Sequence, residues 1–295
     1  MPENDSDNPG LMRRIRGFLP GRLAGRPVVP VVRLHGTIGA VTPLRPGMSL
    51  GSVSKMLEKA FSIRGAKAVA LSINSPGGSP VQSRQIYQRI RQLAEEKKLP
   101  VLVFVEDVAA SGGYMIACAG DEVFCDPSSI VGSIGVVGGT FGFQDLIKKV
   151  GIERRLYTSG DHKSQLDPFL AENPEDVARL KAIQREIHDT FIALVKQSRG
   201  SRLKGDDEYL FTGEYWAGER SVKLGLVDDL GDLRTVLRAR YGDKVQTPVI
   251  APAGGLLSGA LGRKPGSGSL LGLPSFPEDV ISAIETRALW ARYGL

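Results

Sequence analysis

Four short stretches of the sequence combine the side chains and the flexible backbone that nucleophilic catalysis needs. In residues 101–120 an apolar run is followed by Ala-Ala-Ser-Gly-Gly and then by a segment of helical character. Ser111 is thereby placed at a sharp turn between a buried strand and a helix, where small neighbours let a substrate backbone approach closely. Free amides at the helix start can stabilise an oxyanion. Taken alone, however, the stretch favours a simpler role for Ser111 as a helix cap.

The other three stretches supply glycine-rich turns and a basic side chain. Residues 74–79 read NSPGGS, and adjacent glycines, Gly78 among them, let the backbone turn and present amides inward. Ser133 lies between glycines in VGSIGVV and can project into a site. Lys163 lies in TSGDHKSQLDPF, where a loop lysine by itself indicates little, and its neighbour His162 keeps a Ser–His pair open. Each stretch also fits an ordinary structural role, as a turn, a packing corner or a solvated loop.

The scaffold for these stretches is predicted by strands that alternate with helices. Strands are predicted over residues 28–34, 68–73, 101–105, 122–125, 134–137 and 154–157. Helices are predicted over residues 50–63, 83–98, 114–119, 143–150, 174–199 and 233–241. This alternation predicts an α/β fold with a largely parallel sheet covered by helices.

The composition changes at both ends of this pattern. Residues 1–27 form a basic flexible leader with five arginines: Arg13, Arg14, Arg16, Arg22 and Arg26. Residues 28–250 hold the alternating pattern and are predicted to be one domain. Residues 251–295 combine a Gly/Ser-rich linker with a C-terminal amphipathic helix over 277–293.

Composition and charge exclude several classes of function. The chain has 295 residues, of which 42% are apolar and 24% charged, as in ordinary globular proteins. Cys118 and Cys125 are predicted to be buried free thiols, and the spacing of the three histidines indicates no metal site. The net charge of +6 comes without the aromatic–basic pattern of nucleic-acid binders. No apolar run suits a membrane span or a secretory signal, so the leader is expected to be a solvated tail or a basic helix on anionic lipid.

The ordered motifs NSPGG, ASGGYMIA, VGSIGV, SGDHKS and FTGEYWAGERSVKLGLVDDLG resemble the signal peptide peptidase A (SppA) family. The resemblance covers residues 29–240 and fits the short, single-repeat form. It implies a Ser–Lys peptidase on a Clp/crotonase-like fold, which works without ATP or another cofactor and forms a homo-oligomer. The membrane anchor common in that family is not recognised here. A cytoplasmic protein with peripheral contact to the inner membrane surface is therefore expected.

The resemblance also assigns roles to individual residues. It implies that Ser111 is the nucleophile, Lys163 the general base and Ser133 the residue that assists the lysine. It implies further that the backbone amides of Gly78 and Gly112 form the oxyanion hole. Since a lysine acts as a base only when neutral, its amine is expected to be buried away from any carboxylate.

The expected function is endopeptidase cleavage of signal-peptide remnants or unfolded polypeptides. Two alternatives stay open. A crotonase-like acyl-CoA enzyme would use the same pair of amides to hold an enolate. A non-catalytic, membrane-associated scaffold would assemble through the long helix over 174–199 and would not need Ser111.

Overall fold

The structure, a computed structural model, describes residues 26–39, 47–251 and 287–295. Almost all of the basic leader, the Gly/Ser-rich linker and the first part of the helix expected over 277–293 lie outside these residues. Helical structure is present at 287–291, in the last part of that expected helix.

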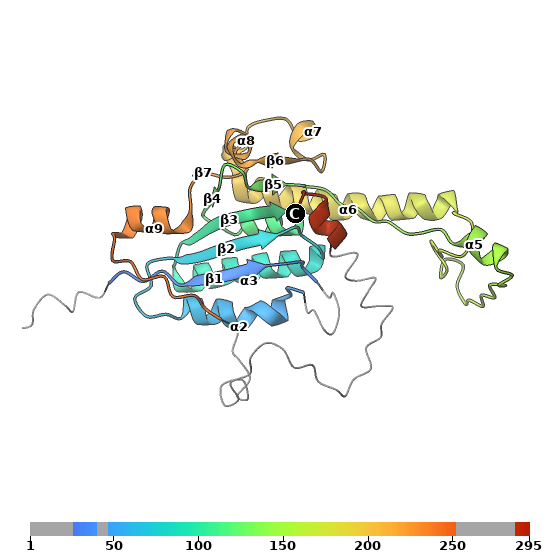
Figure 1. Cartoon of the computed structure of the whole chain (residues 1–295), viewed down its shortest axis with the longest axis horizontal. Coiled ribbons are helices and arrows are strands. Elements are labelled where there is room, and N and C mark those ends of the chain that lie inside the picture. Colours follow the sequence, from blue (N-terminus) through green and yellow to red (C-terminus); the bar gives the residue numbers. More distant parts are fainter. Residues whose placement is uncertain (1–25, 40–46, 252–286) are drawn as a thin grey trace, which may run out of the picture.

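Within the described residues, seven strands form one sheet, in which five lie in the order β1-β2-β3-β4-β7 while β5 pairs with β3 and β6 (Figure 1). The strands are β1 (Val31–His35), β2 (Val69–Ser75), β3 (Val101–Ala110), β4 (Glu122–Cys125), β5 (Ile130–Gly132), β6 (Tyr215–Ala217) and β7 (Asp229–Leu230). All pairs are parallel except β5 with β6. The predicted α/β fold with a largely parallel sheet is confirmed.

The central strands are apolar on both sides because both faces of the sheet are covered. On β2, Val69, Leu71 and Ile73 join the larger core, while Ala70 between them joins a second core on the opposite face. The larger core receives side chains from α2 (Leu50–Phe61), α3 (Pro80–Lys97), α4 (Gly112–Ala117) and α6 (Pro174–Arg199). The second core receives Leu237 of α9 (Leu233–Tyr241). Shorter helices are α5 (Gln144–Lys149), η1 (Gly200–Arg202), α7 (Asp207–Leu210) and α8 (Gly218–Lys223).

Two predicted strands are wrong. The apolar stretch 134–137 is not a strand, because the backbone turns out of the sheet at Ser133, where φ is +54°, and β5 ends just before it. The stretch 154–157 is also not a strand, and its Tyr157 is 89% exposed with no strand beside it to pair with. In addition, β3 runs five residues beyond its predicted end. The added residues at the end of β3 pair with β5.

Residues 137–173, here called the arm, project beyond the sheet near the N-terminal end of α6 (Figure 1). The arm is held together by contacts of its own, among them an ion pair of 2.8 Å between Arg154 and Asp167 and packing of Phe143 on Phe169. Many of its large apolar side chains are exposed: Val137, Phe141, Phe143, Leu146, Val150, Ile152, Leu156, Tyr157 and Leu170. A single chain thus leaves an extended apolar surface in water.

A buried ion pair connects the C-terminal end of α6 to the β4–β7 edge of the sheet. The guanidinium of Arg199 is fully buried and donates two hydrogen bonds of 2.9 Å to the carboxylate of Asp228. The same carboxylate accepts the backbone amide of Val123 at 2.7 Å. Burial by itself raises the pKa of Asp228, but the hydrogen bonds and the charge of Arg199 outweigh it and lower the pKa.

Asp228→Asn is expected to destabilise the fold by about 3–5 kcal/mol, because it leaves the Arg199 charge buried without its partner. Urea unfolding measures this loss, and Asp243→Asn, at the exposed pair with Arg238, is the control with an expected cost below about 1 kcal/mol. Because the pKa of Asp228 is lowered on folding, the carboxylate stabilises the fold above its usual pKa. This contribution is lost as the pH falls through the lowered value. Equal effects of the two substitutions would contradict the prediction.

Candidate active site

Ser111 lies in the tight turn between β3 and α4, in a backbone conformation that is rare for serine. Its φ is +51° and its ψ is −123°. Strain of this kind persists only where the surroundings impose it, and it is common at functional sites. The backbone amide of Ser111 donates to the carbonyl of Gly132 at 2.8 Å, which fixes the turn. Although Ser111 occupies the N-cap position of α4, its hydroxyl makes no capping hydrogen bond, so the capping role favoured by this stretch alone is wrong.

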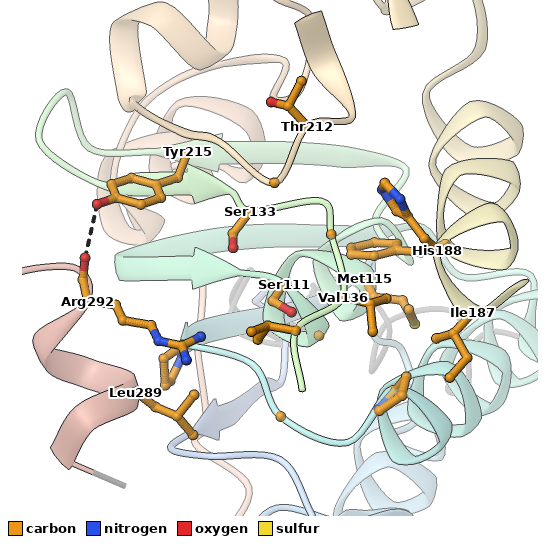
Figure 2. Close-up of a pocket in the computed structure, with 18 of the residues that line it drawn as sticks. Ser111, Met115, Ser133, Val136, Ile187, His188, Thr212, Tyr215, Leu289 and Arg292 are labelled. Atoms are coloured by element: carbon orange, nitrogen blue, oxygen red, sulfur yellow. Dashed lines mark hydrogen bonds between the residues drawn. The ribbon is translucent and has the colours of Figure 1, made fainter. Parts of the chain in front are cut away.

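Ser133 is brought beside Ser111 by the register of two parallel strands. Ala110 at the end of β3 pairs with Gly132 at the end of β5, so the next residue of each strand leaves the sheet at the same edge. The amide of Ser133 donates to the carbonyl of Glu214 at 2.6 Å, and this bond holds the second turn. Figure 2 shows both serine side chains facing one cavity.

Two backbone amides lie next to the Ser111 turn. The glycine loop after β2 packs so closely on this turn that a Cβ on Gly77 would lie 2.8 Å from the Cβ of Ser111 and 2.9 Å from the amide nitrogen of Gly112. A Cβ on Gly112 would lie 3.4 Å from the amide nitrogen of Gly78. Neither Gly78 nor Gly112 donates its amide to an acceptor in the described part of the chain. The two amides are therefore available to stabilise an oxyanion.

The glycine loop, Gly77 and Gly78, is held in place by the completely buried side chain of Ser75 at the end of β2. The hydroxyl of Ser75 donates to the carbonyl of Gly36 at 2.7 Å and accepts the amide of Gly77 at 3.2 Å. The carbonyl of Gly77 in turn accepts the amide of Ile38 at 2.9 Å. These bonds fix the direction of the loop before any ligand arrives, which is the condition for effective electrostatic stabilisation.

The cavity in front of Ser111 has a volume of about 750 Å³. Its apolar walls include Met115, Val136, Val137, Ile187, Phe191 and Leu289. Its polar residues include His188, Thr212 and Tyr215, and Nε2 of His188 lies 2.9 Å from the carbonyl of Ile134 (Figure 2). None of these residues was predicted from the sequence to line the site, although Thr212 and Tyr215 belong to the motif beginning FTGEYWAGE that contributes to the SppA resemblance.

Lys163 and His162 do not line this cavity in a single chain. Both are exposed in the arm, which precedes α6. His188, on the cavity wall, lies 14 residues after Pro174, the first residue of α6, which corresponds to roughly 21 Å of helix. Ser111, Ser133, Gly78 and Gly112 are thus brought together, whereas the lysine expected to act with them is not. The burial that a neutral lysine requires is also not supplied within one chain.

Comparison with known sequences shows the family of the chain. The sequence model of "Peptidase family S49" matches residues 93–245, which is just over half of the chain. The chain belongs to peptidase family S49. The resemblance to the SppA family predicted from the sequence is therefore confirmed.

Relatives of this S49 chain are mostly longer proteins. A Brucella abortus protein named Na(+)/H(+) antiporter NhaA is 54% identical over 297 residues, which cover 97% of this chain and 39% of that protein. The chloroplastic serine protease SPPA of Arabidopsis thaliana is 30% identical over 221 residues, which cover 72% of this chain and 32% of that protein. A solved structure of the 1510-N membrane-bound stomatin-specific protease with a substrate peptide is 19% identical. The structural alignment covers 90% of this chain and the whole of the solved chain, with a TM-score of 0.48. The chain spans less than half the length of these two curated relatives.

The cysteines of the S49 chain have no role as nucleophiles. Cys118 and Cys125 are both buried and free, as predicted. Burial raises the pKa of each thiol to about 12, so both stay protonated at neutral pH.

None of the helices in the described ranges combines the length and the apolar character that a membrane span requires.

Gly78→Ala is expected to lower kcat for peptide hydrolysis about 10²- to 10³-fold, the usual loss when an oxyanion donor is displaced. The loss is expected because the substitution displaces the loop, not because the new methyl group blocks the space for the substrate. The new Cβ would lie 2.0 Å from the carbonyl oxygen of Ile38, at a φ of +142°, so the loop itself must move. Kinetics together with circular dichroism measure the effect, and Gly51→Ala, on the exposed face of α2, is the control. A folded Gly78→Ala chain with normal kcat would exclude this amide from the oxyanion hole.

Proposed function

We propose that this chain is a serine endopeptidase that uses a Ser–Lys dyad, with Ser111 as nucleophile and Lys163 as general base. The observation that carries the proposal is the Ser111 turn itself. Its hydroxyl is not used for capping, its backbone is held in a strained conformation, and beside it lie two amides that donate to no acceptor among the described residues. A member of a peptidase family with this arrangement has the parts that acyl transfer requires.

The chemistry follows from the positions of these groups. The Ser111 hydroxyl attacks a peptide carbonyl while the lysine amine takes its proton. The amides of Gly78 and Gly112 stabilise the negative oxygen of the tetrahedral intermediate. The protonated amine then gives its proton to the leaving nitrogen, and an ester of Ser111 remains. Water attacks that ester by the same steps and restores the serine.

Lys163 reaches Ser111, in this proposal, from a second copy of the chain. The arm that carries Lys163 projects beyond the sheet and exposes apolar side chains that a neighbouring copy would cover. Contact of this surface with the cavity rim of a neighbour would remove the amine from water, and burial favours the neutral form of a lysine. The Ser133 hydroxyl, beside Ser111, would accept a hydrogen bond from the amine and orient it without adding charge. The protein is thus proposed to be a homo-oligomer.

The proposed substrates are short or unfolded peptides with small or apolar side chains near the cut, such as signal-peptide remnants. Support comes from the apolar lining of the cavity, for example Met115, Val136 and Phe191, and from the small residues around Ser111. A cavity of about 750 Å³ has room for a short peptide segment but not for a folded domain, so a substrate has to enter as an extended chain.

An unfolded polypeptide is expected to be cut far faster than the same polypeptide in its folded state. The reason is that a folded substrate must first open locally before its backbone reaches Ser111. Gel electrophoresis of a small protein, digested once in its native form and once after reduction and alkylation, measures the difference. Equal rates for a substrate of high stability would contradict the proposed mode of entry.

The test of the proposed function is covalent labelling with a fluorophosphonate, a serine-directed probe that phosphonylates the hydroxyl and releases fluoride. Mass spectrometry is expected to find the label on Ser111 in the unaltered chain and none in Ser111→Ala. A chain that hydrolyses peptides while Ser111 stays unlabelled would refute the assignment of the nucleophile.

A crotonase-like acyl-CoA enzyme is the second candidate, and the paired amides of Gly78 and Gly112 are the observation that favours it. Such an enzyme would hold an enolate with the two amides and would not need a nucleophile. Turnover of an acyl-CoA that persists in Ser111→Ala would support this alternative.

A further inference from the structure

One wall of the catalytic cavity is made by residues 287–295 of the same chain, here called the tail. Leu289, Arg292 and Tyr293 of the tail line the cavity together with Ser111 and Ser133. In Figure 2 the helical part of the tail lies on one side of the two serines, opposite the side chains of α6. The tail thus stands where a substrate would have to pass.

Three contacts hold the tail in place, and all involve residues of the site. The hydroxyl of Tyr293 donates to Oγ of Ser133 at 3.2 Å. The hydroxyl of Tyr215 donates to the carbonyl of Arg292 at 3.0 Å, and the rings of Tyr215 and Tyr293 meet edge-on with centroids 5.0 Å apart. Tyr215 is itself fixed beside Ser133, because it pairs with Gly132 in the β5–β6 register.

The contact between Tyr293 and Ser133 concerns the general base. In the proposed Ser–Lys mechanism the hydroxyl of Ser133 accepts a hydrogen bond from the amine of Lys163. With the phenol of Tyr293 at 3.2 Å, the Ser133 hydroxyl already accepts a hydrogen bond from the tail, and the lysine amine would have to approach the same oxygen beside that phenol. The tail also forms part of the wall of the cavity in front of Ser111, through Leu289, Arg292 and Tyr293.

We propose that the tail is an intramolecular inhibitor that keeps the site latent, with the Tyr293 hydroxyl occupying the place of the Lys163 amine on Ser133. Tail and arm then compete for one side chain. The enzyme is active only when the tail has left the cavity and the lysine has entered it. A peptide substrate has to displace the tail too, so its apparent affinity falls with the fraction of chains in which the tail is docked. This inference rests on the proposed function.

The test uses the whole 295-residue chain with Tyr293→Phe, which removes one hydroxyl and keeps the ring. The loss of one neutral hydrogen bond is expected to raise the undocked fraction, and with it kcat/KM for a fluorogenic peptide, about 2- to 10-fold. Tyr241→Phe, on α9 at the opposite face of the sheet, is the matched control and is expected to leave kcat/KM unchanged. An unchanged or lower kcat/KM in Tyr293→Phe would overturn the inference, because a tail that only completes the site would lose activity.

A second measurement needs no catalysis. The synthetic peptide RALWARYGL, the sequence of the tail, is titrated into Ser111→Ala and into Ser111→Ala/Tyr293→Phe. The double variant is expected to bind it about 2- to 10-fold more tightly, because its own tail competes less well. If the double variant binds the peptide more tightly but no chain, including the unaltered one, hydrolyses peptides, the docking of the tail in the cavity stands and the proposed function is refuted. Hydrolysis that depends on Ser111, with equal peptide affinities and equal rates, would refute the inference alone.

Hydrogen exchange locates the tail directly. The amides of Arg292 and Tyr293 donate to the carbonyls of Ala288 and Trp290, and so short a helical segment is not stable in water by itself. Their protection from exchange therefore reports docking. Protected amides in the unaltered chain, which exchange faster in Tyr293→Phe, are expected. Exchange at the rate of an unstructured peptide in the unaltered chain would overturn the inference.

Discussion

Ser111→Ala is expected to abolish peptide hydrolysis while the fold stays intact. Removal of a serine nucleophile typically costs on the order of 10⁴- to 10⁶-fold in kcat, and only binding and the oxyanion amides remain. The cost in stability is small, since the hydroxyl makes no capping bond and the backbone turn is held through the amide of Ser111 and the carbonyl of Gly132. Kinetics with a fluorogenic peptide and thermal unfolding of the same preparation measure both effects.

The matched control is Ser128→Ala, at an exposed turn after β4, which is expected to keep its full activity. The two variants remove the same group, one from the cavity and one from the surface. A purified Ser111→Ala chain that still cuts peptides at the normal rate would refute the mechanism. A chain with no peptidase activity but with intact acyl-CoA turnover would favour the crotonase-like alternative.

The parts of the site that follow from local sequence were predictable. An apolar run followed by small residues is enough to place Ser111 at a strand-to-helix turn. The pair of glycines after β2 likewise predicts a loop with inward amides. The meeting of Ser111 with Ser133 follows from the parallel register of β3 and β5, which no local pattern contains. Family resemblance supplied that link before the structure did.

The errors have physical causes of their own. The run Ile134–Gly135–Val136–Val137 is apolar like a strand, but Val136 and Val137 line the cavity wall instead of pairing with another strand. Apolar residues of an exposed interface or of a ligand site cannot be told from core residues by periodicity alone. The same ambiguity produced the false strand over 154–157, whose apolar side chains belong to the exposed arm.

Contacts between distant segments were beyond prediction from sequence. Tyr293 and Ser133 are separated by 160 residues, and nothing in either segment indicates the other. The residues around Lys163 contain no pattern that shows where the arm projects. The sequence therefore predicted Lys163 as the base without showing that one chain keeps it away from the serine.

Lys163→Ala is expected to be inactive, whereas His162→Ala is expected to keep most of its activity. Loss of the general base is expected to leave the serine unactivated, and the resemblance to the SppA family places the lysine, not its neighbour, in that role. Both side chains are exposed in the arm, so neither substitution should affect the stability of a single chain. Hydrolysis of the same fluorogenic peptide, with oligomer size checked by light scattering, measures the difference. A dead His162→Ala beside an active Lys163→Ala would replace the Ser–Lys dyad by a Ser–His pair.

Mixing the two inactive variants tests where the lysine comes from. If each site takes its serine from one copy and its lysine from another, random assembly of equal amounts of Ser111→Ala and Lys163→Ala gives roughly one quarter of the sites both groups. The mixture is then expected to recover about a quarter of the normal rate after dissociation and reassembly. If Lys163 acts within its own chain, every site in the mixture lacks one of the two groups and no activity returns. Such a result would leave the Ser–Lys chemistry in place but would exclude the second copy as the source of the base.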